Sequence, residues 1–336
     1  MRIDVHAHYW TDGYLSLLAE YGKTDTDAQR GRGAGGDAAE LDARFALMDA
    51  AGVTMQVLSA SPQLPHFENR VHALYAAQYI NDLYVTVIAR HPHRFAAFAA
   101  LPLPHVDGAL RELDRALALP GVIGVAITTS ILGRSLVDPL FTPILQELDR
   151  RSAVLYVHPS GCGAGAPLIR EFNLTWMLGA PIEDTIAAVH LITAGIPARY
   201  RHLKIINSHL GGALPMLLQR LDNQYAWEAP ETPEAPSHAA RRMWYDTVAY
   251  GHVPALRCAC DSFGADRLLL GTDFPYEVGA QFQRAIDYIH DSGLPPSTVT
   301  KILDVNAPAV LGVAKPLTEG AGAGACESTQ ERGGAR

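Results

Sequence analysis

Residues 154–161 read VLYVHPSG, a short apolar run that ends in a histidine and is followed at once by a turn signal. A run of this length, rich in β-branched and aromatic residues, indicates a strand that is buried on both faces. The same pattern recurs along the chain. The predicted strands span residues 2–6, 55–59, 95–101, 122–127, 154–158, 204–208, 243–248 and 268–271.

Amphipathic stretches separate these strands. The predicted helices span residues 41–51, 70–90, 107–118, 141–151, 185–194, 216–225 and 253–263. Strands that alternate with helices favour a buried parallel sheet, and eight strands in this rhythm favour a closed barrel over an open doubly wound sheet. We therefore expect an α/β protein with a single (β/α)8 TIM barrel over residues 1–312.

Two segments fall outside this alternation. Residues 22–39 contain four glycines between positions 31 and 36 among charged residues, which predicts a flexible loop after the first strand. Residues 313–336 are rich in glycine, alanine and charge and lack apolar residues that could pack, so we expect a disordered tail. Neither segment is typical of an inter-domain linker, and the 336 residues therefore do not predict two domains.

The composition narrows the class of protein. Hydrophobic residues make up 48% of the chain and charged residues 18%, as in a globular domain with a large core. The formal net charge of −8 disfavours nucleic acid and anionic membrane as partners. The four cysteines are too scattered for a disulfide framework, and we find neither an apolar leader nor an apolar run of membrane-spanning length. We therefore expect a cytoplasmic protein.

Polar side chains suited to metal binding stand at the ends of four predicted strands. His6 and His8 close the first strand and share one face, because alternate residues of a strand point the same way. His158, His209 and Asp273 each follow directly on an apolar strand. The carboxyl ends of the strands form the rim of a β/α barrel where active sites are built, so we expect these five side chains to converge.

The chemistry of this set supports a metal site. Neutral imidazoles and one carboxylate suit a borderline divalent metal and leave positions open for water and substrate. We interpret His6, His8, His158 and Asp273 as the ligands. His209 is interpreted as an acid/base group beside the metal, because histidine titrates near neutrality, and a fourth nitrogen ligand is the alternative.

The motifs around these residues resemble those of the amidohydrolase superfamily. They are DVHAH at residues 4–8, VHP at 157–159, SHLGG at 208–212 and LGTDFPY at 270–276. More narrowly, they are similar to the branch typified by α-amino-β-carboxymuconate-ε-semialdehyde decarboxylase and by hydroxybenzoate decarboxylases of the 6-methylsalicylate type. The resemblance implies a (β/α)8 barrel, one divalent metal ion, with zinc preferred over manganese, and non-oxidative decarboxylation.

Further residues follow from the resemblance. Arg44 matches a family arginine that holds the substrate carboxylate, a role that suits the paired donors of a guanidinium; a surface helix arginine is the alternative. Trp176 matches a family tryptophan that lines the pocket, although a lone tryptophan is more often plain core. Ser160 stands where members with the muconate substrate usually carry tryptophan, which implies a pocket of different shape.

We therefore expect a carboxy-lyase that acts on a small aromatic or unsaturated acid, such as an ortho-hydroxybenzoate or carboxymuconate semialdehyde. His209 and Asp273 would be the catalytic residues. A mononuclear metal-dependent hydrolase of a lactone or amide is the alternative for the same site. The expected partner is the small carboxylate substrate, with a homodimer as the expected assembly and neither nucleic acid nor membrane.

Overall fold

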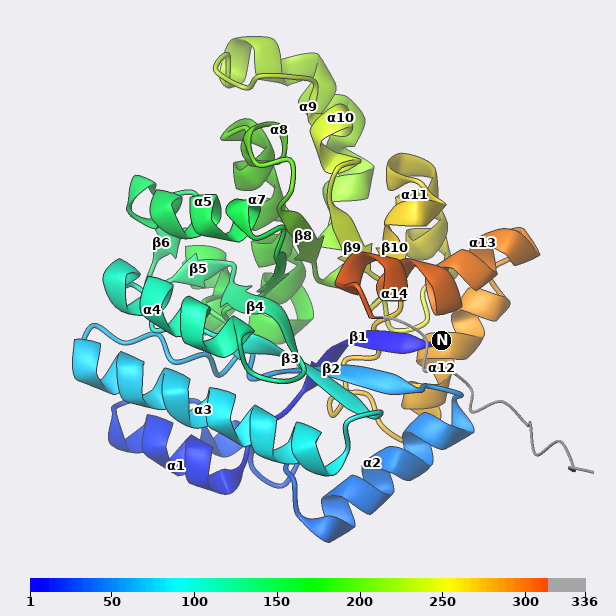
Figure 1. Ribbon diagram of the computed structural model, residues 1–336. Coiled ribbons are helices and arrows are strands. Elements are labelled where there is room, and N and C mark those ends of the chain that lie inside the picture. The colour runs from blue at the N-terminus through cyan, green and yellow to red at the C-terminus, as the bar shows by residue number, and fades with distance from the viewer. Residues whose placement is uncertain (314–336) are drawn as a thin grey trace, which may run out of the picture.

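The computed structural model describes residues 1–313, and its centre is one sheet of eight parallel strands (Figure 1). The strands follow one another in the order β1-β2-β3-β4-β7-β8-β9-β10. Their bounds are Ile3–His8, Met55–Ser59, Phe95–Ala100, Val122–Thr128, Val154–His158, Lys204–Asn207, Trp244–Asp246 and Leu268–Leu269. Two further strands, β5 (Ser130–Ile131) and β6 (Arg134–Ser135), form a small antiparallel pair after β4.

The two ends of the sheet meet and close the barrel. The backbone N–H of Val5 in β1 donates to the carbonyl of Leu270, 2.9 Å away, and that of His8 donates to Phe274 at 2.7 Å. Ala7 and Phe274 form a parallel bridge. The structure therefore confirms the (β/α)8 TIM barrel that the alternation of strands and helices predicts.

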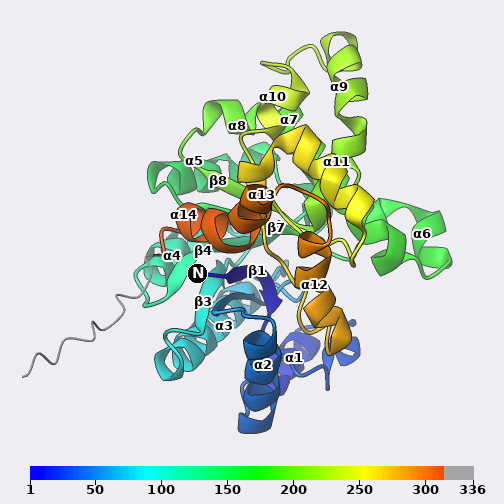
Figure 2. The ribbon, with the colours of Figure 1, turned by 90° about the vertical axis from the view of Figure 1, so that its right-hand side faces the viewer.

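Helices form an outer layer around the barrel (Figures 1 and 2). Those in the first half are α1 (Asp12–Glu20), α2 (Ala38–Ala50), α3 (Arg70–Arg90), α4 (Val106–Leu117), α5 (Thr142–Arg150), α6 (Pro167–Glu171) and α7 (Ala180–Thr193). Those in the second half are α8 (Ile196–Arg199), α9 (Leu214–Glu228), α10 (Pro236–Ala240), α11 (Val253–Phe263), α12 (Ala280–His290), α13 (Pro296–Thr300) and α14 (Asn306–Leu311). The predicted helices are all present, with ends that differ by several residues at most.

Side-chain caps explain where two of these helices begin. Asp37 precedes α2, and its carboxylate accepts a hydrogen bond from the backbone N–H of Glu40. Asn69 precedes α3 and accepts from the N–H groups of Val71 and His72. Such caps satisfy donors that the first helical turn leaves without partners, and they fix the point at which the chain leaves each preceding loop.

The glycine-rich segment 22–39 is in contact with the barrel mouth. The indole N–H of Trp10 donates to the carbonyl of Gln29 at 3.2 Å, and the Tyr276 hydroxyl donates to the Gln29 side-chain oxygen at 2.5 Å. Gln29 and Ala34 are buried. The prediction of a flexible loop therefore missed these anchoring contacts, which attach the segment to residues that flank the predicted site.

Two other predictions concern the ends and the environment of the chain. The predicted disordered tail lies, from residue 314 onward, outside the described residues. Within residues 1–313, none of the helices combines the length and apolar character needed to cross a membrane.

Candidate active site

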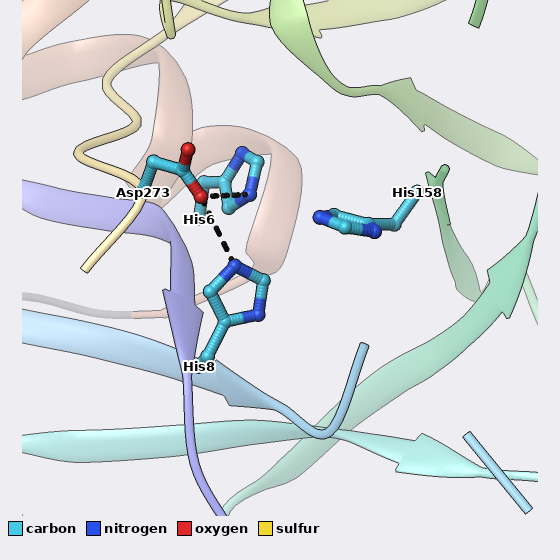
Figure 3. Close-up of side chains that lie close together, drawn as sticks. All are labelled: His6, His8, His158 and Asp273. Carbon is cyan, nitrogen blue, oxygen red and sulfur yellow. Dashed lines mark hydrogen bonds and ion pairs between the residues drawn. The ribbon is translucent and has the colours of Figure 1, made fainter. Parts of the chain in front are cut away.

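Four side chains converge at the carboxyl ends of β1, β7 and β10 (Figure 3). His6 and His8 come from β1, His158 is the last residue of β7, and Asp273 follows β10. One ligand atom from each residue lies within 4.8 Å of those of the other three, and all four residues are buried. The structure thus brings together the set that the sequence analysis interprets as metal ligands.

β1 contains a bulge at the first of its two histidines. The register between β1 and β2 shifts between Asp4 and Ala7. The Asp4 carboxylate stabilises this bulge by accepting from the backbone N–H of His6 at 3.0 Å. It also accepts from the Thr272 hydroxyl at 2.6 Å, which ties the start of β1 to the residue before Asp273. Asp4 therefore fixes two ligand-bearing segments relative to each other.

The outer nitrogens of two histidines are held by acceptors. His6 Nδ1 lies 2.8 Å from Asp246 Oδ2, and His158 Nδ1 lies 2.9 Å from the carbonyl of Pro159. Because carboxylate and carbonyl oxygens only accept, both Nδ1 atoms carry a proton, and Nε2 is the nitrogen of each ring that is left to bind a metal ion. His6 Nε2 is buried, and Asp273 Oδ1 lies 3.2 Å from it. A buried nitrogen atom beside a carboxylate oxygen fits a metal ligand.

The ionisation of the cluster also suits a cation. Burial opposes the charged form of His6, but the carboxylates of Asp246 and Asp273 outweigh it and raise the His6 pKa to about 10. Burial lowers the pKa of His8 to about 4 and holds that of His158 well below its usual range. For Asp273, burial is outweighed by the His6 and His8 rings, so its pKa is well below the usual value. The site therefore contains an ionised carboxylate that attracts positive charge.

The two oxygens of Asp273 have different surroundings. Oδ1 faces the histidines, 3.2 Å from His6 Nε2 and 3.1 Å from His8 Nε2. Oδ2 accepts a hydrogen bond from the Tyr250 hydroxyl at 2.8 Å. Three imidazoles and one carboxylate oxygen form the donor set that zinc and related divalent metals prefer, so the residues present fit a single divalent ion.

His209 lies beside this set but does not belong to the four-residue group. Its ring centroid is 5.0 Å from that of His6 and 5.7 Å from that of His158. Its Nδ1 contacts Asp184 Oδ2 at 2.9 Å, and its backbone N–H donates to Asp246 Oδ1. This position is compatible with the acid/base role assigned from the sequence, which stays a prediction.

The structure places Arg44 directly behind His8, on the outer side of the barrel wall. It reaches β1 and β2 from α2 in the outer layer of helices. Its Nε donates to the Gln56 side chain at 2.6 Å and its Nη1 donates to the carbonyl of His8 at 3.0 Å. The guanidinium lies 4.4 Å from the centroid of the Phe274 ring, and the residue is 1% exposed. Arg44 is therefore placed to stabilise the barrel wall behind His8, which rules out the surface-arginine alternative, and its role with a substrate carboxylate stays a prediction.

Trp176 lies next to the loop that follows β7. It belongs to the helical turn η4 (Thr175–Gly179) and is 47% exposed. A Cβ atom at Gly161 would lie 2.8 Å from the Trp176 ring, so the absence of a side chain at Gly161 lets the indole pack on the backbone. Trp176 therefore packs on the loop that directly follows His158. Its role in lining a substrate pocket stays a prediction.

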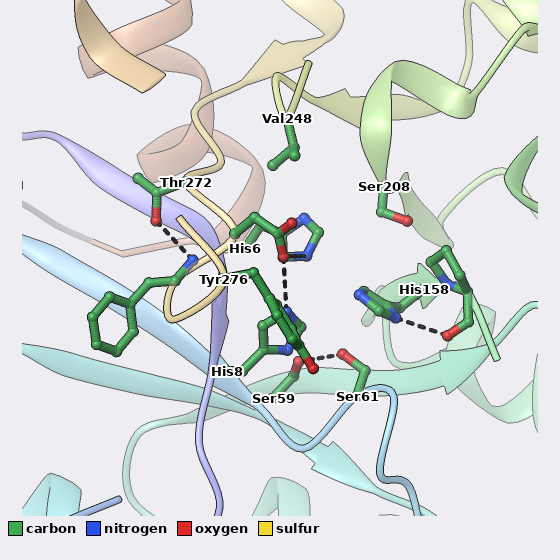
Figure 4. A network of polar contacts seen from close by, with 12 residues as sticks. His6, His8, Ser59, Ser61, His158, Ser208, Val248, Thr272 and Tyr276 are labelled. Carbon is green, nitrogen blue, oxygen red and sulfur yellow. Dashed lines mark hydrogen bonds and ion pairs between the residues drawn. The ribbon is translucent and has the colours of Figure 1, made fainter. Parts of the chain in front are cut away.

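Aromatic and hydroxyl groups flank the cluster on the β1–β2 side (Figure 4). The ring centroid of His8 is 5.2 Å from that of Tyr276 and 5.6 Å from that of Trp10. Ser59, at the end of β2, bonds to Ser61 with 2.7 Å between the hydroxyl oxygens. This arrangement provides flat apolar surfaces with hydroxyl groups beside them.

Three residues that contact the site were not predicted from the sequence. Asp246 bonds to His6, and it ends β9, so the rule that found His158 and Asp273 could have found it too. Asp184 lies within α7, and Tyr250 follows β9 with a φ of +51°. Acidic and aromatic residues are common in helices and loops, so the sequence carries no particular signal for these two.

Comparisons with known proteins agree with this geometry. The family model described as amidohydrolase matches residues 3–313. The chain is 26% identical over 299 residues to 2-amino-3-carboxymuconate-6-semialdehyde decarboxylase of Dictyostelium discoideum, covering 83% of each chain. It is 29% identical over 290 residues to gamma-resorcylate decarboxylase of Rhizobium radiobacter, covering 79% of this chain and 85% of that one.

A solved structure shares the fold. Dihydroxybenzoic acid decarboxylase from Polaromonas sp. JS666, determined with bound manganese and the inhibitor 2-nitroresorcinol, superposes with a TM-score of 0.79. The match covers 94% of this chain and 98% of that chain at 24% sequence identity. With a family model that spans nearly all of the described residues, this chain belongs to the amidohydrolase family.

Proposed function

We propose that this protein is a mononuclear metal-dependent decarboxylase of a small aromatic or unsaturated carboxylic acid. The observation that carries the proposal is the convergence of His6, His8, His158 and Asp273 into one buried donor set with His209 beside it. Two curated relatives from different organisms are named as decarboxylases of such acids, which supports the same reaction class.

The chemistry divides between the bound ion and the residues around it. His6, His8, His158 and Asp273 would hold the ion, which supplies positive charge that orients the substrate carboxylate and a neighbouring oxygen. His209 lies close enough to the cluster to exchange a proton with the carbon that bears the carboxylate. Once that carbon is protonated, the bond to the carboxyl group breaks, carbon dioxide leaves, and the bonding electrons restore the conjugated system.

The flanking groups favour a planar substrate. Trp10 and Tyr276 lie beside His8, and a flat aromatic acid can pack against an aromatic ring in this position. The hydroxyl groups of Ser59 and Ser61 lie on the same side and can bond to a phenolic oxygen. Among the expected substrates, these contacts favour an ortho-hydroxybenzoate over the open-chain muconate semialdehyde.

The proposal also includes the identity of the metal ion, the oligomeric state and the cellular location of the protein. Three nitrogen donors and one oxygen donor favour zinc, and manganese is the alternative that one structural neighbour contains. Exposed apolar side chains on α6, which projects from the barrel in Figure 2, and on η4 support a homodimer. We propose a cytoplasmic location on the basis of the scattered cysteines.

A substrate panel tests the reaction class. The metal-loaded protein is incubated with 2,6-dihydroxybenzoate, 6-methylsalicylate and, in parallel, aryl lactones and amides, while carbon dioxide release and ring opening are followed. A decarboxylase releases carbon dioxide from an acid and leaves the lactones and amides intact. Hydrolysis of a lactone or amide without any carbon dioxide release would favour the hydrolase alternative and would reject the proposal.

A further inference from the structure

A buried carboxylate outside the metal-ligand set contacts the candidate catalytic histidine. Asp184 lies in the first turns of α7 and is 2% exposed. Its Oδ2 atom is 2.9 Å from His209 Nδ1, and its Oδ1 atom accepts from the Ser208 hydroxyl at 2.8 Å. A helix of the outer layer thus reaches the two residues that directly follow β8.

The hydrogen-bonding capacities of these groups define the arrangement of protons. A carboxylate oxygen can only accept, so the bond between His209 and Asp184 requires a proton on Nδ1. The other ring nitrogen, Nε2, lies on the opposite edge and is the atom left to take up and deliver the proton that the substrate carbon receives. Because Nδ1 is turned toward α7, this other edge is the one left free to meet a substrate at the cluster.

The loop that carries His209 is built tightly against the same turn of α7. A side chain at Gly212 would collide with the carbonyl of Pro181, so the two backbones are in direct contact. The backbone N–H of Ala213 donates to the Thr185 hydroxyl at 2.8 Å. The bonds from Asp184 are therefore part of a continuous contact between this loop and the helix.

The backbone of His209 is held in an unfavourable conformation. Its φ is +50°, in the left-handed region that non-glycine residues rarely adopt. The N–H of His209 donates to Asp246 Oδ1 at 2.9 Å, which holds the main chain. Asp184 holds the side chain from the other side. Strained conformations persist only where the surroundings fix them, and here both the main chain and the ring are fixed.

We propose that Asp184 is a positioning residue that keeps His209 in the Nδ1–H form, with Nε2 presented to the substrate carbon. The proposal rests on the proposed function, because it concerns how the same site places its acid/base group. Asp184 acts through His209 and contacts none of the four metal ligands by hydrogen bond. Its loss should therefore change turnover without changing metal content.

The kinetic test compares two variants of one network. Asp184→Ala removes both acceptors, and the loss of an outer partner of this kind is expected to lower kcat about 10- to 100-fold with KM nearly unchanged. Ser208→Ala is the matched control: it removes the bond to Oδ1 and leaves the bond to His209, so its kcat should stay near the wild-type value. Wild-type kcat in Asp184→Ala, or an equal loss in Ser208→Ala, would overturn the proposal.

A second measurement does not depend on activity and is made on the wild-type protein. Imidazole nitrogen NMR of histidine-labelled, zinc-loaded wild-type protein reports which ring nitrogen of His209 carries the proton, with the signal identified by its absence in His209→Gln. We expect the proton on Nδ1. An Nδ1 atom without a proton would refute the positioning role, even in a protein that releases carbon dioxide. If the wild type decarboxylates none of the acids but shows the Nδ1–H form, the proposed function fails while the arrangement stands.

Discussion

Asp246 offers a sharp test of how the metal site is organised. Its Oδ2 accepts from His6 Nδ1 at 2.8 Å and from the Tyr156 hydroxyl at 3.0 Å. Its Oδ1 accepts from the backbone N–H groups of His209 and Val248 at 2.9 and 3.1 Å. Asp246→Asn keeps the shape but replaces one accepting oxygen by an NH2 group that only donates.

The effect of Asp246→Asn on metal binding depends on which of these four donors can reorient or accept a hydrogen bond instead. The two backbone N–H groups cannot turn, so the amide oxygen must face them and the NH2 group must face His6 and Tyr156. The Tyr156 hydroxyl can rotate and accept, whereas His6 can accept on Nδ1 only if its proton moves to Nε2. That proton occupies the lone pair that would bind the metal. We expect metal affinity to fall about 10- to 100-fold, or about 1.4–2.8 kcal/mol.

Competition between the metal-free protein and a chelator measures this affinity directly. Tyr156→Phe is the matched control, because it removes the other bond to the same oxygen and leaves the His6 bond in place. It should bind zinc nearly as tightly as the wild type. The reasoning is refuted if Asp246→Asn retains wild-type affinity, or if Tyr156→Phe weakens binding by the same factor.

Other substitutions separate metal binding, turnover and stability. His158→Ala and Asp273→Ala should each lose the metal by elemental analysis, whereas His209→Ala should keep it and lose turnover; metal loss in His209→Ala would make that residue a ligand. Arg44→Met should lower the free energy of unfolding in urea by about 2–4 kcal/mol, because two buried acceptors lose their donors. Glu183→Gln should speed amide hydrogen exchange in the loop after β7, because the Glu183 carboxylate accepts hydrogen bonds from backbone N–H groups of that loop. Unchanged exchange rates would contradict this.

The fold and the convergence of His6, His8, His158 and Asp273 could be predicted from sequence because both follow from local patterns. The sequence itself shows where three strands end, because each apolar run stops at or shortly before a polar site residue. These residues are His158, His209 and Asp273. In a closed parallel barrel all those ends lie on one rim, so local order along the chain becomes proximity in space. The bulge in β1 changes only the register there, and His6 and His8 still point inward.

The surroundings of the ligands could not be predicted in the same way. Arg44 resembles a substrate-binding arginine in its motif, but whether a helix residue faces the barrel wall or its mouth depends on packing between α2 and the strands. Asp184 contacts His209 only because α7 packs directly on the loop after β8. The glycines of residues 22–39 indicate backbone freedom, yet the position of Gln29 is set by distant partners such as Tyr276.

The proposed decarboxylation requires a metal ion held by His6, His8, His158 and Asp273. The most direct test removes all metal with a chelator and restores it in steps in deuterated water, with 2,6-dihydroxybenzoate as substrate. Carbon dioxide release should be absent at first, rise in proportion to metal up to one ion per chain, and leave deuterium on the carbon that carried the carboxyl group. Full release from the metal-free protein would contradict the account.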